Sequence, residues 1–192
     1  MMKNFSKWII LQSEKKIAIW ILILLAFFES SVFPIPPDLM LIPMILALRE
    51  KAWFIAGVCT LASVSGGLAG YALGYYLFES FGEPLIEFYG YNDKLALFEE
   101  YFNRWGGWIV AAGGLTPLPY KLVTFSSGAL ALDPWVFLLS SILGRGLRFY
   151  ILAALLWHFG PTIQRLFNGH YALVILLVLL ALAGTFLAIG VL

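Results

Sequence analysis

The first long apolar stretch of the chain is interrupted by Phe33-Pro34-Ile35-Pro36-Pro37-Asp38, and a later stretch by the similar run Thr116-Pro117-Leu118-Pro119-Tyr120-Lys121. When Pro34 is aligned with Pro117, Pro36 falls on Pro119 and Asp38 falls on Lys121, so an acid stands opposite a base. Proline donates no backbone hydrogen bond and clashes inside a helix, so we expect both segments to break there. In lipid, a broken backbone is tolerated only where protein or a water-filled cavity covers it. Paired interrupted segments in the two halves of a membrane protein predict the binding site of a transporter.

The composition predicts a membrane protein. Hydrophobic residues make up 61% of the 192 residues and charged residues 12%, and the mean hydropathy is +0.90, which is far from the balance of soluble proteins. This length favours one membrane domain over residues 1–192. Twelve basic and eleven acidic residues leave little net charge, so nucleic acid is not an expected partner. The single Cys59 excludes a disulfide framework and a cysteine-based metal site, and we expect no metal and no cofactor.

Three segments are long and apolar enough to cross a bilayer, which takes about 20 residues: residues 52–78, 134–159 and 171–192. Segments 17–48 and 107–132 contain the proline runs. We expect each to form a re-entrant hairpin that enters and leaves on the same side; hydropathy leaves a kinked full span open as the alternative.

Residues 83–106 lie before the second hairpin. They place Leu95, Phe98, Phe102 and Trp105 at helical spacing, which predicts an amphipathic helix that lies in the membrane interface or packs on the protein's own surface. The predicted fold is therefore all-α: a polytopic helical membrane protein with two opposed hairpins, about three full transmembrane helices and an interfacial helix.

The distribution of lysine and arginine predicts the orientation. Residues 1–16 carry four lysines, whereas residues 79–104 carry only Lys94 and Arg104 together with six acids. Basic residues favour the cytoplasmic side, so the N-terminus should be cytoplasmic and the hairpins should enter from opposite faces and meet near the midplane. Asp133-Pro134 predicts a helix start, with the acid as N-cap and proline in the first helical position.

Two acids flank the first proline run. Glu29 precedes it and Asp38 ends it, inside an otherwise uncharged apolar stretch. An anion at membrane depth is expensive, so such carboxyl groups tend to take up protons. We expect Glu29 and Asp38 to carry or sense protons; the alternative is that either residue marks the membrane surface at a helix end.

Three bases are candidates for binding an anionic head group. Lys121 ends the second proline run, and Arg145 and Arg148 lie deep within the segment 134–159. Each is costly at that depth unless it is paired or hydrated, and arginine offers bidentate contacts to phosphate. The alternative is internal pairing with Glu29 and Asp38, and the two arrangements could alternate during a cycle.

Small residues predict close helix packing. Gly66, Gly70 and Gly74 form consecutive G-x-x-x-G steps within the segment 52–78, a spacing that lets helix backbones approach closely. The sequence contains no nucleophile elbow, no zinc-binding histidine motif and no phosphate-binding glycine loop, so we do not expect an enzyme.

Four runs together resemble the DedA family, also called the SNARE-associated Golgi protein or VTT-domain family. They are the run from Phe28 to Asp38, the glycine–tyrosine helix Gly66–Tyr76, the run Gly113–Gly128 and the run Gly144–Arg148, in the family's order. The resemblance covers roughly residues 20–160.

The resemblance implies two re-entrant hairpins that face each other, a location in the bacterial plasma membrane, and lipid transport or scrambling coupled to the proton gradient. The implied substrates are undecaprenyl phosphate or a phospholipid such as phosphatidylethanolamine. The family's two acids correspond to Glu29 and Asp38. Many members carry two arginines around the second break, but here Gly114-Leu115 occupies the earlier region and Lys121 the later basic site, and a lysine is a point charge rather than a bidentate fork.

The function expected from the sequence is movement of an anionic-headgroup lipid, a polyprenyl phosphate or a phospholipid, across the membrane, with protons as the coupling ion. A proton-coupled ion or small-solute antiporter and a structural or assembly membrane protein are the alternatives. The chain could form a homo-oligomer, and the sequence leaves the lipid and the direction of transport open.

Overall fold

The computed structural model describes residues 16–31, 36–78, 80, 84, 92–116 and 119–166, and within these ranges the chain is helical with no strand. The predicted all-α class is confirmed for this part of the chain. The expected span 171–192 and the breaking residues Pro34 and Pro117 lie outside the described residues. The helices are α2 (Lys16–Ser31), α3 (Asp38–Ala47), the 3-10 turn η1 (Arg49–Lys51), α4 (Ala52–Leu77), α6 (Asn92–Leu115), α7 (Tyr120–Ala129) and α8 (Pro134–Leu166).

Helices end and restart on either side of each proline run. α2 ends at Ser31 and α3 begins at Asp38, directly after Pro37, while α7 begins at Tyr120, directly after Pro119. Proline is tolerated beside a helix start because the first N–H groups of a helix have no partner within it. Pro36 and Pro37 stand between α2 and α3, where the chain changes direction.

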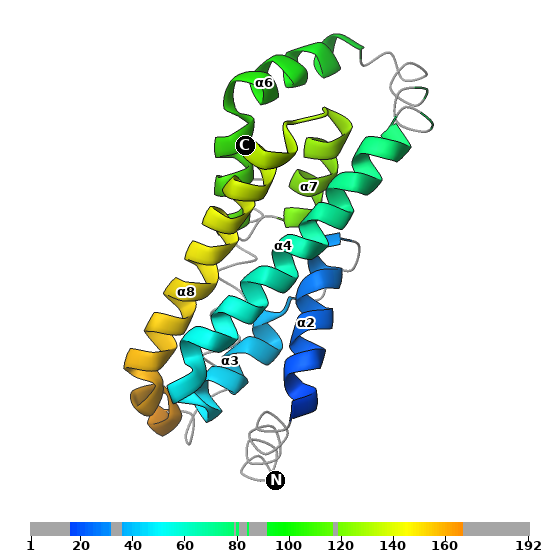
Figure 1. Ribbon diagram of the computed structural model, residues 1–192. Coiled ribbons are helices and arrows are strands. Elements are labelled where there is room, and N and C mark those ends of the chain that lie inside the picture. Colours follow the sequence, from blue (N-terminus) through cyan, green and yellow to red (C-terminus); the bar gives the residue numbers. More distant parts are fainter. Residues whose placement is uncertain are drawn as a thin grey trace.

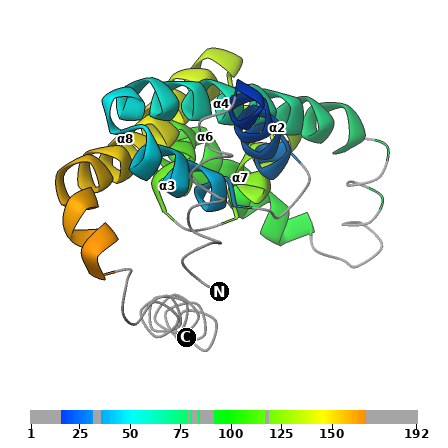
Figure 2. The same cartoon turned by 90° about the horizontal axis from the view of Figure 1, so that it is seen from below.

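The two interrupted segments approach the centre of the bundle from opposite ends (Figure 1). α2 rises from one end and α3 returns toward it, whereas α6 descends from the other end and α7 turns back. α4 and α8 run the length of the bundle, and α4 packs against α2, α7 and α8. In the view from below, α4 runs along one edge of the bundle with α3 and α7 on its inner side (Figure 2).

Both interruptions reach α4 near its middle. Ser30, beside the end of α2, contacts Ser63. On the other side, a Cβ added at Gly67 would lie 3.3 Å from the ring of Tyr120, the first residue of α7. Ser63 and Gly67 lie close to the midpoint of Ala52–Leu77, so the two breaks meet at one level of the bundle.

Glycines of α4 make these approaches possible. A side chain at Gly66 would overlap the carbonyl group of Phe27 on α2, and one at Gly74 would overlap the carbonyl group of Phe125 on α7. At Gly70, between them, an added Cβ would lie 3.2 Å from Cβ of Thr124. Absence of a side chain therefore brings α4 into backbone contact with both interrupted segments.

The surface of the bundle is apolar. Two of the described helical stretches, Arg49–Leu77 and Pro134–Gly160, are long and apolar enough to cross a membrane, and they correspond to the expected spans 52–78 and 134–159. Large apolar side chains point outward from them, among them Leu61 (67% exposed) and Leu139 (64%). Such continuous apolar exposure is typical of a surface that faces lipid.

The structure has no helix end at the predicted boundary between residues 106 and 107. We expected an interfacial helix over 83–106 and a new element from 107, but α6 runs without a break from Asn92 to Leu115. Within it Phe102 is buried, whereas Phe98 and Trp105 are about half exposed. The side chain of Leu95 and most of 79–91 lie outside what the structure describes.

Candidate functional site

Two arginines of α8 reach the two arms of the first interrupted segment. Arg145 donates to Oε2 of Glu29 near the end of α2, and Arg148 Nη2 lies 2.5 Å from Oδ2 of Asp38, the first residue of α3. Residues three positions apart lie on the same side of a helix, so both arginines face this segment. The side chain of Arg145 is fully buried and that of Glu29 is 15% exposed, whereas Arg148 and Asp38 are 21% and 24% exposed.

A serine pair extends the inner ion pair into α4. Arg145 Nη2 donates to Ser30 Oγ at 2.9 Å, and Ser30 Oγ donates to Glu29 Oε2 at 3.1 Å. Ser63 Oγ lies 2.7 Å from Ser30 Oγ, and both serines are fully buried. These hydrogen bonds hold the mostly buried carboxylate of Glu29 and the fully buried guanidinium of Arg145 in place.

The second interrupted segment touches the same arginine. The Tyr120 ring lies under the guanidinium group, with 4.3 Å between the ring centroid and Arg145 Cζ, a cation–π distance. The Tyr120 hydroxyl donates to Ser141 Oγ at 2.5 Å, and Thr124 Oγ1 donates to the Ser30 carbonyl at 3.3 Å. Tyr120 therefore joins the second break to the charges at the first.

The cluster has unused hydrogen-bonding capacity. Among the described residues, Nε and Nη1 of Arg145 and Oδ1 of Asp38 are buried and have no hydrogen-bond partner. Buried polar atoms are normally satisfied by protein, water or a ligand. These two guanidinium nitrogens of Arg145 can donate hydrogen bonds to oxygen atoms of a further group.

The structure brings together four of the five charged residues singled out in the sequence. Glu29, Asp38, Arg145 and Arg148 form the cluster, in the internally paired arrangement. Lys121 lies in the first turn of α7, next to Tyr120, and forms no ion pair with an acid in the described part of the chain. The positive end of a helix dipole lies at its N-terminus, so a cation there is unfavourable and an anion favourable.

The sequence did not single out Ser30, Ser63 or Tyr120 as site residues. Tyr120 belongs to the second proline run, which was the available signal, whereas a serine in an apolar helix carries none. No group of three histidine, cysteine, aspartate or glutamate side chains lies close enough to hold a metal ion within the described ranges. The predicted N-cap is confirmed, because Asp133 Oδ1 accepts the N–H groups of Trp135 and Val136 at 2.8 and 3.0 Å.

Comparison with known proteins identifies related sequences. A family model described as the VTT domain matches residues 35–158. An uncharacterized protein of Haemophilus influenzae is 34% identical over 143 residues, which cover 74% of this chain and 74% of that protein. An uncharacterized protein of Histophilus somni is 36% identical over 143 residues, with the same coverage of 74% on each side. No solved structure matches the chain.

Proposed function

Because the chain belongs to the VTT-domain family, which is the DedA or SNARE-associated family, we propose that it moves a lipid with an anionic head group across the bacterial plasma membrane, driven by the proton gradient. Its apolar helices and its family indicate a membrane protein. In the proposed topology the N-terminus is cytoplasmic, α4 and α8 span the bilayer, and the two interrupted segments are re-entrant hairpins from opposite sides.

The observation that carries this proposal is the pairing of both acids of the first break with Arg145 and Arg148, because Arg145 also contacts Tyr120 at the second break. A carboxylate and a phosphate compete for the same guanidinium donors, and arginine binds either one in the same planar geometry. The free donors of Arg145 and the cation Lys121 at a helix N-terminus are available to a phosphate as well.

Protonation supplies the coupling in this mechanism. When Glu29 and Asp38 take up protons, their ion pairs with the arginines weaken and Arg145 and Arg148 can bind a lipid phosphate. When the acids lose their protons, they displace the phosphate and restore the paired state. A ligand shifts the equilibrium between the paired and the unpaired state only if it binds one of them more tightly than the other. For protons to drive transport, both the protons and the lipid head group must bind more tightly to the unpaired state.

The test is the movement of labelled phospholipid and polyprenyl phosphate in proteoliposomes, with and without a pH gradient. Asp38→Asn and Lys121→Gln are compared with the wild type, and Glu50→Gln, which alters an exposed acid of η1 outside the cluster, is the matched control. We expect gradient-dependent transport that Asp38→Asn abolishes, Lys121→Gln reduces and Glu50→Gln leaves intact.

Other outcomes point elsewhere. Lipid movement indifferent to the gradient and to Asp38→Asn would mean passive scrambling, with the acids in a structural role. Solute flux without lipid movement, from protein shown to be folded, would replace the proposal with a proton-coupled antiporter. Loss of abundance alone in the variants would favour a structural or assembly protein.

A further inference from the structure

The beginning of α3 is held to the rest of the bundle by few contacts. Its first residue, Asp38, meets Arg148 of α8 through one carboxylate oxygen, Oδ2, while Oδ1 is buried without a hydrogen-bond partner. An ion pair that water reaches contributes little free energy. Leu39 is 70% exposed, and Leu41 is the one fully buried side chain among residues 38–42. One ion pair and one apolar side chain therefore hold these five residues.

The other end of α3 is held more firmly. Met44 and Ile45 are both fully buried. Directly after the helix, Arg49 of η1 donates a hydrogen bond to the Trp157 carbonyl of α8. In a regular helix the N–H of residue 161 would bind this carbonyl, but Pro161 has no N–H. Arg49 supplies the missing donor, so this end of α3 is tied to α8 by a bond that α8 itself cannot make.

Pro43 separates the two parts of α3. It lies inside the helix, so the carbonyl of Leu39 has no backbone N–H four residues later to bind. Sharp bends in helices occur mostly at such positions. Residues 38–42 can therefore tilt at Pro43 while the part that carries Met44 and Ile45 stays packed.

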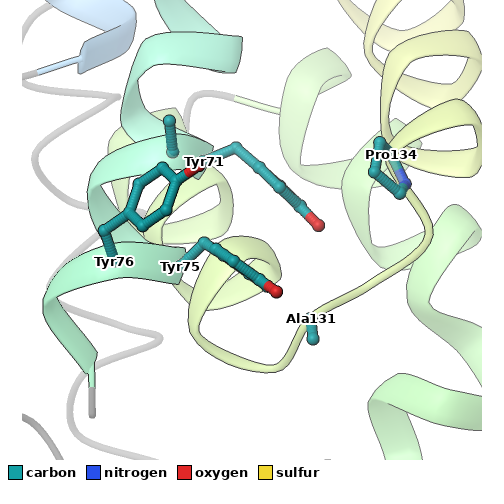
Figure 3. Close-up of a pocket in the computed structure, with 6 residues that line it drawn as sticks. Tyr71, Tyr75, Tyr76, Ala131 and Pro134 are labelled. Atoms are coloured by element: carbon teal, nitrogen blue, oxygen red, sulfur yellow. The ribbon is translucent and has the colours of Figure 1, made fainter.

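The returning arm of the second interrupted segment has no comparable freedom. Side chains added at Gly74 and Gly128 would overlap the carbonyl groups of Phe125 and Tyr71, so the backbones of α4 and α7 touch. The Tyr71 hydroxyl also donates to the Leu132 carbonyl at 2.5 Å, beside the pocket that Figure 3 shows between α4 and the loop after α7. α7 is thus fixed to α4 along its length and at its end, which leaves α3 as the arm that can move.

We propose that residues 38–42 form a flap at the outer side of the charged cluster, hinged at Pro43 and latched by the ion pair between Asp38 and Arg148. When the latch is weakened, the flap tilts away from α8 and α4, and the end of α3 next to η1 stays in place. This motion belongs to the chain itself and requires neither a lipid nor a proton gradient.

Cys59 is a natural probe of the flap. It is the only cysteine of the chain, it is fully buried in the same apolar cluster as Leu41 and Met44, and it lies within electrostatic reach of Asp38 and Arg148. The experiment measures the rate at which N-ethylmaleimide alkylates Cys59 in the purified full chain in detergent micelles, at one fixed pH, by mass spectrometry. The rate reports how often the flap uncovers the thiol.

The variants separate the latch from other effects. Asp38→Asn and Arg148→Gln both weaken the latch, but they change the local charge in opposite directions, so a direct electrostatic effect on the thiol would drive their rates apart. Pro43→Ala restores a backbone donor inside α3 and stiffens the hinge. Glu50→Gln, which alters an exposed acid of η1, is the matched control.

Asp38→Asn and Arg148→Gln should each raise the alkylation rate about threefold to fivefold, the scale expected for the loss of a partly exposed ion pair. Pro43→Ala added to either variant should return the rate to that of the wild type or below. Glu50→Gln should leave the rate unchanged. Unchanged rates in both latch variants, changes of opposite sign, or a faster rate that persists after Pro43→Ala would each overturn the proposal.

A second buried thiol distinguishes the flap from unfolding of the whole bundle. Val110 is fully buried on α6, which packs on α7 and α8. Val110→Cys in a Cys59→Ala background should be alkylated at the same rate with and without Asp38→Asn. Equal acceleration of this thiol and of Cys59 would show that the bundle opens as one unit, and the flap would be refuted.

Discussion

Replacing Glu29 by glutamine tests the buried ion pair most directly. Glutamine keeps the length of the side chain and an oxygen that accepts hydrogen bonds from Arg145 and Ser30, so the main loss is the negative charge. Arg145 is 0% exposed, and a buried charge that loses its partner costs about 3–5 kcal/mol. Because the hydrogen bonds survive, we expect the lower end, about 3 kcal/mol, or roughly a 100-fold change in the unfolding equilibrium.

Asp38→Asn is the matched comparison, because it makes the same chemical change in the outer pair. Asp38 and Arg148 retain 24% and 21% exposure, so solvent screens their attraction. Pairs that water reaches contribute about 1 kcal/mol or less. The structure therefore predicts that Glu29→Gln destabilises the protein more than Asp38→Asn does, by about 2 kcal/mol.

The assay is equilibrium unfolding of the purified protein in mixed micelles, followed by circular dichroism. The double variant Glu29→Gln with Arg145→Gln provides the control for coupling, because removal of both charges should recover part of the lost stability. Equal destabilisation by Glu29→Gln and Asp38→Asn would contradict the inference that burial sets the strength of the inner pair. Strict additivity in the double variant would contradict the pairing itself.

Three further predictions use the same assay. Gly66→Ala should destabilise the protein by about 1–3 kcal/mol, because the added methyl group overlaps α2. Gly146→Ala is the control: an added Cβ there has its nearest contact at 3.8 Å, so the change should be neutral or stabilising. Equal effects of the two variants would refute the close approach of α4 to α2. Tyr120→Phe should lower the free energy of unfolding by about 1 kcal/mol, because it removes the hydroxyl hydrogen bond to Ser141. Tyr120→Leu should lower it by about 1 kcal/mol more, because it also removes the ring under Arg145. Identical losses in the two variants would contradict the cation–π contact. Asp133→Ala should cost about 1 kcal/mol through the lost cap of α8, and Asp133→Asn little; a neutral alanine variant would contradict the capping role.

The sequence predicts the fold best where a backbone rule acts locally. Proline cannot continue a helix, so the interruptions before Asp38 and Tyr120 could be located without knowledge of the rest of the structure. The start of α8 could be located in the same way, because Asp133-Pro134 is a local capping signal. Each of these features depends on only a few neighbouring residues.

Features that depend on tertiary packing were harder to predict. Pairing of the bases with Glu29 and Asp38 was one of the alternatives considered from the sequence. The sequence did not indicate which arginine pairs with which acid, because Arg145 and Glu29 are 116 positions apart and meet only through tertiary packing. The structure has no helix end at the expected boundary 106/107, because α6 continues through Gly106 and Gly107. A Cβ at Gly107 would lie 3.1 Å from Ser140 on α8, so close packing of α6 on α8 outweighs the low helix propensity of glycine.

The meeting of both breaks near the middle of α4 has an electrical consequence. Ser63, which contacts the end of α2, and Gly70, beside Thr124 of α7, bracket the level at which the breaks meet, and they are about 10 Å apart along the helix axis. With the bundle set across a membrane as proposed and water entering each hairpin, the transmembrane voltage would fall over about 10 Å instead of about 30 Å. The field acting on Glu29 and Arg145 would then be about three times that in an unmodified bilayer, so voltage as well as pH would bias their pairing.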